Sequence, residues 1–270
     1  DLHKEYRRQR QMCIRDRPWK GGGMIEANGA WHPQAPSAVP YLKGWPAPDP
    51  MKNDDLCRVK KAFVDATLHA DRAGFDTIQL HMAHGYLLHQ FLSPITNRRS
   101  DQYGGDLNSR MRYPLEIFEA VRAAFPSKKP VMVRLSATDW IEGGWDIEQS
   151  IEFCRALKKL GCDMVDVSSG GLDQAQKIIT GPGYQTDLSQ RIRSESGIAT
   201  MTVGQITDPI QAETILRTDQ ADMVALARGM LWDPRWTWKA AVALDQEIEL
   251  PAPYARCNPK LSATPFVSRK

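Results

Sequence analysis

The sequence has few cysteines for its length, and none of them forms a recognisable metal-binding or redox motif. Five occur in 270 residues, at positions 13, 57, 154, 162 and 257, and no two are spaced C-x-x-C. An odd number of scattered cysteines in a long chain argues against a disulfide framework and against a zinc cluster. Such usage is typical of a reducing compartment, and we therefore expect a cytoplasmic protein.

Long apolar runs and a dominant charge are also absent. Mean hydropathy is -0.45, and no apolar stretch approaches the ~20 residues needed to cross a bilayer, so we expect no membrane association. The net charge is only +3, and residues 1–20 hold seven Lys or Arg against three acidic residues. The remainder of the chain is close to neutral and shows no recurring basic face, which argues against a nucleic-acid partner.

What the chain does contain, from residue 55 onward, is an alternation of strand-like and helix-like segments. Short runs rich in Val, Ile and Met predict buried strands at 75–81, 130–137, 164–170, 198–204 and 223–228. Amphipathic segments before, between and after them predict helices at 55–73, 108–124, 146–160, 208–217 and 234–245. Since a parallel strand connection needs a crossover, this order predicts an α/β fold with a parallel sheet.

Two parallel architectures fit this order: a doubly wound open sheet and a (β/α)8 TIM barrel. Polar residues at the carboxyl ends of the predicted strands (His81, Arg134, Ser168 and Arg228) favour the barrel, which carries its chemistry there. No G-x-G-x-x-G follows any strand, which weakens the alternative. Only about the last five βα units of a barrel are recognisable.

The sequence predicts four parts in the chain. We expect residues 1–17 to be a non-native or disordered leader, and 18–54 to form loops because they are rich in glycine and proline. Residues 55–250 would form the partial barrel, and 251–270 a C-terminal tail.

The segment that begins at the end of the first predicted strand carries the densest set of reactive side chains. His81, His84 and Tyr86 lie within a few residues of one another. Two imidazoles can polarise a carbonyl oxygen, and a phenol can deliver a proton. Two other interpretations remain open, namely that the histidines are structural, or that they bind zinc together with His89. No Asp or Glu occurs from 77 to 100, which disfavours a metal site.

The segment IQLHMAHGYLLHQFLSPITNRRSDQYGGDLNSRMRYPLEIFEAV resembles the signature of the Old Yellow Enzyme family of FMN-dependent ene-reductases, which are (β/α)8 barrels. The resemblance continues through VMVRLSATDW, VDVSSGG, TVGQIT and ALARGMLWDPRW. It is nearest to the thermophilic-like bacterial branch of NADH:flavin oxidoreductases, with the first three strands absent. The resemblance implies that His81 and His84 bind the substrate's carbonyl oxygen and that Tyr86 donates the proton.

The resemblance also implies that Arg134 faces the pyrimidine edge of the flavin, where its charge would favour negative charge on the ring. A buried arginine paired with Asp139 or Asp166 is the alternative. Barrels often bind phosphate in the loops after their last two strands, which here contain Gly204 and Ala227-Arg228. Ser169 and Gly170 add a hydroxyl and N–H groups at the preceding strand, although each glycine could simply form a turn.

These features predict an FMN-dependent oxidoreductase that uses NAD(P)H to reduce an α,β-unsaturated carbonyl compound. By resemblance, Arg256 would reach a neighbouring subunit's active site, so a homodimer or homotetramer is expected; an ordinary tail residue is the alternative. The competing functions are a metal-dependent hydrolase on the same barrel and an inactive fragment of the ene-reductase.

Overall fold

The computed structural model describes residues 33–257. The expected leader, 1–17, lies outside these residues. The central sheet consists of β3 (Ile78–Met82), β4 (Val131–Ser136), β5 (Met164–Ser168), β6 (Ala199–Val203) and β7 (Met223–Ala225). All four strand pairings are parallel, and the spatial order is β3-β4-β5-β6-β7. Each strand therefore lies beside its sequence neighbour, as in a barrel, with no reversal of the kind that defines a doubly wound sheet.

The strands alternate with helices α2 (Asn53–Arg72), α3 (Leu87–Leu92), α4 (Leu107–Ala124), α5 (Ile147–Lys159), α6 (Thr186–Ser196) and α7 (Pro209–Arg217). Three of the helices begin at an aspartate whose carboxylate accepts a backbone N–H from the first turn: Asp106, Asp146 and Asp208. The sequence patterns predicted neither α3 nor α6. Both are short and polar in places, and tertiary contacts decide such segments.

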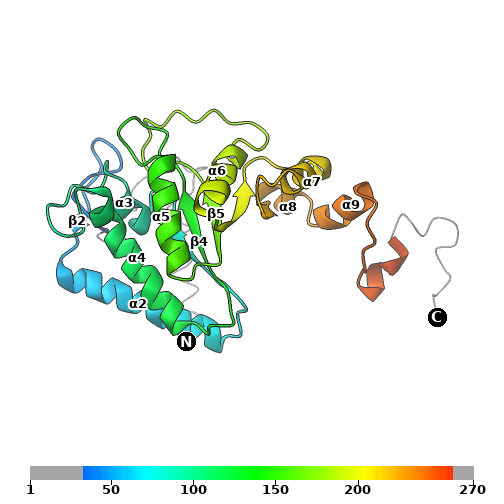
Figure 1. Ribbon diagram of the computed structural model, residues 1–270, viewed down its shortest axis with the longest axis horizontal. Coiled ribbons are helices and arrows are strands. Elements are labelled where there is room, and N and C mark those ends of the chain that lie inside the picture. The colour runs from blue at the N-terminus through cyan, green and yellow to red at the C-terminus, as the bar shows by residue number, and fades with distance from the viewer. Residues whose placement is uncertain (1–32, 258–270) are drawn as a thin grey trace.

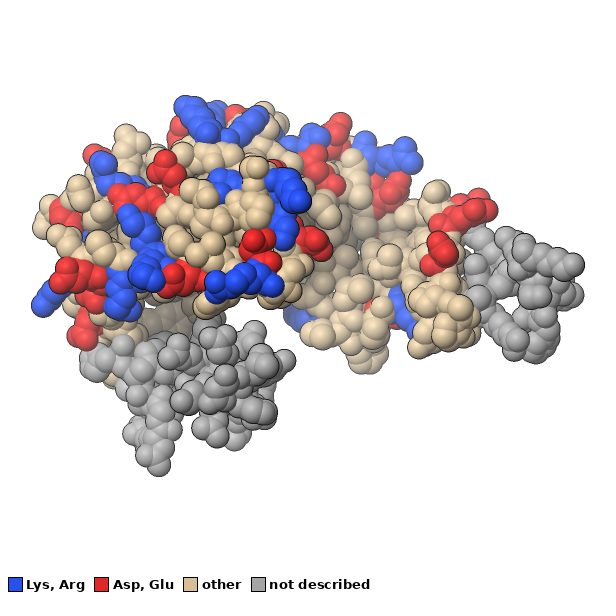
Figure 2. All heavy atoms as spheres, turned by 90° about the horizontal axis from the view of Figure 1, so that it is seen from below, with Lys and Arg blue, Asp and Glu red and all other residues tan. Residues whose placement is uncertain are grey.

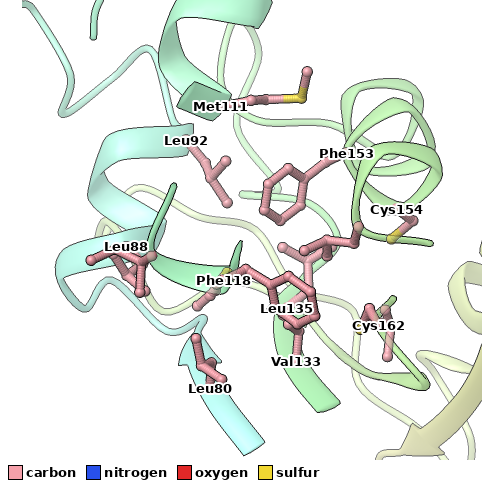
Figure 3. Close-up of a cluster of buried hydrophobic side chains, with 14 of the residues drawn as sticks. Leu80, Leu88, Leu92, Met111, Phe118, Val133, Leu135, Phe153, Cys154 and Cys162 are labelled. Carbon is pink, nitrogen blue, oxygen red and sulfur yellow. The ribbon is translucent and has the colours of Figure 1, made fainter. Parts of the chain in front are cut away.

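The helices cover one face of the sheet, and the main core lies between the two layers. In Figure 1, α4 and α5 lie in front of β4 and β5, and α2, α4, α5 and α6 pack successively against one another. Figure 3 shows Leu92, Phe118 and Phe153 converging on Val133 and Leu135. All five side chains are fully buried. Burial of this apolar surface is the main stabilising term.

The opposite face of the sheet is more open and more polar. Successive strand residues point to opposite faces, so His81, Arg134 and Asp166 lie away from the helices. His81 is exposed and Arg134 partly exposed, whereas the alternate positions Val133 and Val165 are fully buried. In a closed barrel this face is the interior.

The segment 18–54, expected to be loop, contains two short strands in its described part. β1 (Gln34–Ala35) pairs in parallel with β2 (Asp49–Pro50). The chain from 33 to 50 thus forms a closed loop whose ends are held by backbone hydrogen bonds. Within residues 33–257, no helix is long and apolar enough to cross a membrane.

The C-terminal part forms a separate, smaller cluster. Helices α8 (Arg228–Trp232) and α9 (Trp236–Ala243) and the 3-10 helix η2 (Ala252–Cys257) extend away from the main helical layer (Figure 1). Ile206, Ile215 and Trp236 pack together there, apart from the main core. Figure 2 shows basic and acidic side chains interspersed over the larger part of the face in view.

Candidate active site

Strand register brings three charged or titratable side chains into one row. His81 on β3 is opposite Arg134 on β4, and Arg134 is opposite Asp166 on β5. Residues paired across parallel strands lie on the same face of a sheet. The row crosses the open face close to the carboxyl ends of the strands, where barrel enzymes place their reactive groups.

The structure also brings together the three rings that the sequence singled out. The His81 ring centroid lies 5.2 Å from that of His84 and 5.1 Å from that of Tyr86. Tyr86 is 45% exposed and directly precedes α3. The two imidazoles and the phenol therefore meet at one edge of the sheet, on the side that carries Arg134.

Two glycines allow this arrangement. Gly85 has a φ of 74°, and a Cβ there would collide with the carbonyl oxygen of Gly171. Gly171 has a φ of 89°, and its Cβ would lie 2.7 Å from the His84 Cα. Left-handed backbone with no room for a side chain admits only glycine. The loop after β3 therefore packs directly on the loop after β5, and this contact orients His84 and Tyr86.

Hydrogen bonds hold His84 from two sides. Its backbone N–H donates to Ser136 Oγ at 3.0 Å, and Ser136 in turn donates to the Gly170 carbonyl oxygen at 2.9 Å. Its ring Nε2 lies 2.6 Å from Ser168 Oγ. The other ring nitrogen, Nδ1, has no hydrogen bond to the described residues and is available to a ligand.

Both histidines are held in the neutral form. The His81 side chain is open to solvent on one side, but neighbouring protein atoms desolvate its ring in part and lower its pKa, and the nearby positive charge of Arg134 adds to the effect. The same two causes lower the pKa of His84 to about 4. At neutral pH each ring therefore carries one N–H and can donate a single hydrogen bond without introducing a charge.

We expect a pH dependence of stability from His84. Between its unfolded pKa of 6.5 and its folded pKa of about 4, the unfolded chain binds a proton that the folded chain does not. Stability should therefore fall as the pH falls through this interval. Urea denaturation midpoints at several pH values should decline less steeply for His84→Gln than for the unmodified chain. Parallel decline in both proteins would contradict the shifted pKa.

Arg134 forms one of the two ion pairs that its sequence context suggested. Its Nη1 lies 3.0 Å from Asp166 Oδ2, and the Asp166 side chain is only 4% exposed. Burial raises the pKa of Asp166, and the Arg134 charge acts in the opposite direction. Arg134 Nε is buried with no hydrogen-bond partner among the described residues. The carboxylate thus offsets much of the arginine charge, while one N–H stays unsatisfied.

His89 does not join the other two histidines, so the three-histidine metal site is wrong. Its ring is fully buried, with Nε2 at 2.8 Å from Asp139 Oδ1 and Nδ1 accepting from the Gly85 N–H at 2.9 Å. Asp139 also accepts from the Ser93 hydroxyl and the Trp145 N–H. In the part of the chain that the structure describes, no group of three His, Cys, Asp or Glu could hold a metal ion.

The His89–Asp139 pair is a structural support that the sequence did not reveal. It fixes the Gly85 backbone between His84 and Tyr86, and Asp139 comes from the loop after β4. A histidine three residues after Tyr86, on the buried side of a short helix, is the only sequence signal. Its partner is about fifty residues away and has no motif of its own.

The segment 168–171 is more fully bonded than expected. Ser169 Oγ donates to Gln185 Oε1 at 2.6 Å, and the Gly170 N–H donates to the Thr138 carbonyl oxygen at 2.8 Å. The Gly171 N–H donates to a glutamine side chain. The expectation that this segment offers free N–H groups is therefore wrong at Gly170 and Gly171. Similarly, the space in front of Gly204 is occupied by the ring of Tyr184.

The three remaining candidates belong to the C-terminal part of the chain. Ala227 and Arg228 are exposed at the start of α8, and Arg228 makes no ion pair with the residues that the structure describes. Arg256 belongs to η2, which follows α9. The side chain of Arg256 lies outside the part of the chain that the structure describes.

Comparison with known proteins assigns the chain to a family. Residues 18–247 match the profile of the NADH:flavin oxidoreductase / NADH oxidase family. The chain belongs to this family. It is 41% identical over 222 residues to the NADPH dehydrogenase of Geobacillus thermodenitrificans and 42% identical to that of Bacillus velezensis. These alignments cover 82% of the chain and 64% and 65% of the two relatives, respectively.

Solved structures agree with this membership in the NADH:flavin oxidoreductase family. Morphinone reductase superposes with a TM-score of 0.66 at 27% identity, over 85% of this chain and 64% of that protein. An old yellow enzyme homologue from Zymomonas mobilis gives 0.65 at 28% identity, over 78% of this chain and 62% of that protein. The (β/α)8 fold class is confirmed, with five parallel βα units among the described residues.

The described residues of this family member fit a flavin on the open face of the sheet. The unsatisfied Arg134 Nε is a buried donor that an acceptor on the ring could satisfy. The neutral imidazoles of His81 and His84 nearby add no positive charge that would compete with Arg134 for such an acceptor. Arg228 is exposed and could bind the phosphate of the cofactor. Gly170 and Gly204, which were also expected there, already lie close to neighbouring side chains.

Proposed function

We propose that this chain forms the substrate-binding part of an FMN-dependent NAD(P)H oxidoreductase that reduces activated alkenes. The cluster of His81, His84 and Tyr86 beside Arg134 is the observation that supports it most directly. Bound FMN would supply the hydride-transfer chemistry. Arg134 would hold the flavin ring, and Arg228, with the adjacent Ala227, would hold its phosphate. Ser169, Gly170 and Gly204 would lie beside the cofactor at the neighbouring strand ends.

The histidines would bind the carbonyl oxygen of an α,β-unsaturated substrate. If Ser168 donates to His84 Nε2, the ring proton is on Nδ1, which can then donate to the substrate. Neutral donors suit an oxygen that gains negative charge during the reaction, because they stabilise that charge without forming an ion pair in the ground state. Among residues 33–257, no third ligand group joins His81 and His84, which makes a zinc hydrolase the weaker candidate.

Tyr86 would protonate the α-carbon of the substrate. A phenol has an ordinary pKa near 10 and stays protonated at neutral pH, so it can donate. Its ring lies 5.1 Å from that of His81, so the donor and the carbonyl-binding group would contact the same ligand. We further propose that the intact protein is a homodimer or homotetramer, with Arg256 near a neighbouring active site.

Flavin content and alkene reduction test this function. The purified 270-residue chain should take up about one FMN per chain on titration, followed by the visible spectrum, and should oxidise NADPH with cyclohex-2-enone as acceptor. Replacing Arg134 with Met should weaken FMN binding by about tenfold, since one good hydrogen bond to a charged group is worth roughly 1.5 kcal/mol. A chain that folds but retains no FMN would favour the inactive fragment.

A further inference from the structure

A hollow opens beside Tyr86, whose ring also lies close to that of His81. It has a volume of about 380 Å³ and lies between the loop 33–48 and the start of α3. Sites for small molecules commonly have volumes of about 300–1,000 Å³. Apolar walls come from Val39, Trp45, Ile95 and Leu172, among others. The hollow is thus large enough for one ring-sized substituent.

Four polar side chains around this hollow, those of Gln34, Ser37, Gln90 and Thr96, are already bonded within the protein. Gln90 donates to the Gly85 carbonyl oxygen, and Thr96 donates to the Gln90 carbonyl oxygen. Ser37 accepts a backbone N–H, and the Gln34 amide is bonded to two charged side chains of α2. A ligand therefore gains little hydrogen bonding from these groups, and the wall behaves as an apolar surface.

The described wall of the hollow carries the negative charge of Asp173, which disfavours an anionic ligand. Asp173 lines the hollow, and none of the described residues that line it is Lys or Arg. An anionic substituent would face a carboxylate with no compensating cation. A hydrophobic substituent, by contrast, is favoured in proportion to the apolar area it buries. Burial next to the Trp45 indole suits an aromatic or alicyclic ring.

Tyr86 belongs both to the cluster with His81 and His84 and to the lining of the hollow. It lines the hollow, and its ring lies 5.1 Å from that of His81. We propose that the hollow binds an uncharged aryl or alicyclic substituent of the alkene while the histidines bind its carbonyl group. This inference rests on the proposed function and adds the substrate class, namely enones with a bulky, uncharged ring substituent.

Paired substrates and a saturated probe test the inference. In the FMN-loaded chain, we expect 4-phenylcyclohex-2-enone to have a kcat/KM about tenfold above that of its carboxyphenyl analogue.

Trp45→Ala removes most of one wall, and the kcat/KM ratio of 4-phenylcyclohex-2-enone to cyclohex-2-enone should fall about tenfold. Val39→Trp fills the hollow and should lower the same ratio without removing a wall. Trp232→Ala, at a residue that is 92% exposed on α8, is the matched control and should leave the ratio unaltered.

Binding of 4-phenylcyclohexanone, measured by calorimetry, provides a readout that needs no turnover. Its affinity should fall about tenfold in Trp45→Ala, and that of cyclohexanone much less. If enones are not reduced but this binding difference persists, the hollow is the site and the proposed function is wrong. If enones are reduced and neither Trp45→Ala nor Val39→Trp changes the ratio, the inference about the hollow is overturned.

Discussion

Replacing Asp139 with alanine is expected to lower the free energy of unfolding by about 3–5 kcal/mol, the usual cost of removing one member of a buried pair. The carboxylate is fully buried and accepts hydrogen bonds from the His89 ring, the Ser93 hydroxyl and the Trp145 N–H. Without it, three buried donors lose their acceptor. Urea denaturation followed by circular dichroism would measure the change.

An exposed aspartate provides the control for this substitution. Asp76 lies on the surface before β3, and Asp76→Ala should change stability by no more than about 0.5 kcal/mol. His89→Ala should resemble Asp139→Ala, because both leave buried groups unsatisfied. Equal stability of the Asp139 and Asp76 variants would show that the buried network contributes little.

Replacing Tyr86 with phenylalanine is expected to slow alkene reduction by about 10²–10⁴-fold, the usual contribution of a positioned proton donor. The substitution removes the hydroxyl and keeps the ring that contacts His81. Reduction of the bound cofactor by NADPH needs no proton from Tyr86 and should change little. Stopped-flow measurement of the two half-reactions separates these effects.

Tyr103→Phe is the matched control, because the Tyr103 hydroxyl lies 3.4 Å from Glu116, in the region of α4. It should leave both half-reactions unchanged. If Tyr86→Phe slows both half-reactions equally, Tyr86 has a general role in ligand or cofactor binding and is not the proton donor.

Much of the fold could be read from the sequence because its signals are local. Each buried strand is a short apolar run, and the longer helices carry an amphipathic repeat, so five strands and five helices were predicted near their observed positions. The segments that were missed lack such signals. The strands β1 and β2 have only two residues each. Helix α6 is rich in polar residues, and its contacts with α5 and β6 stabilise it.

Local patterns in the sequence specify the parallel α/β fold and the group of His81, His84 and Tyr86 at the end of one strand, since both depend on neighbouring residues. Three features follow from the folded chain and not from local pattern. Arg134 pairs with Asp166, His89 supports the loop instead of joining the other histidines, and a hollow lies beside Tyr86. The physical reason is that each of these features joins groups from separate strands or loops. Their contacts depend on register and on the close approach of two loops at Gly85, which no local pattern encodes.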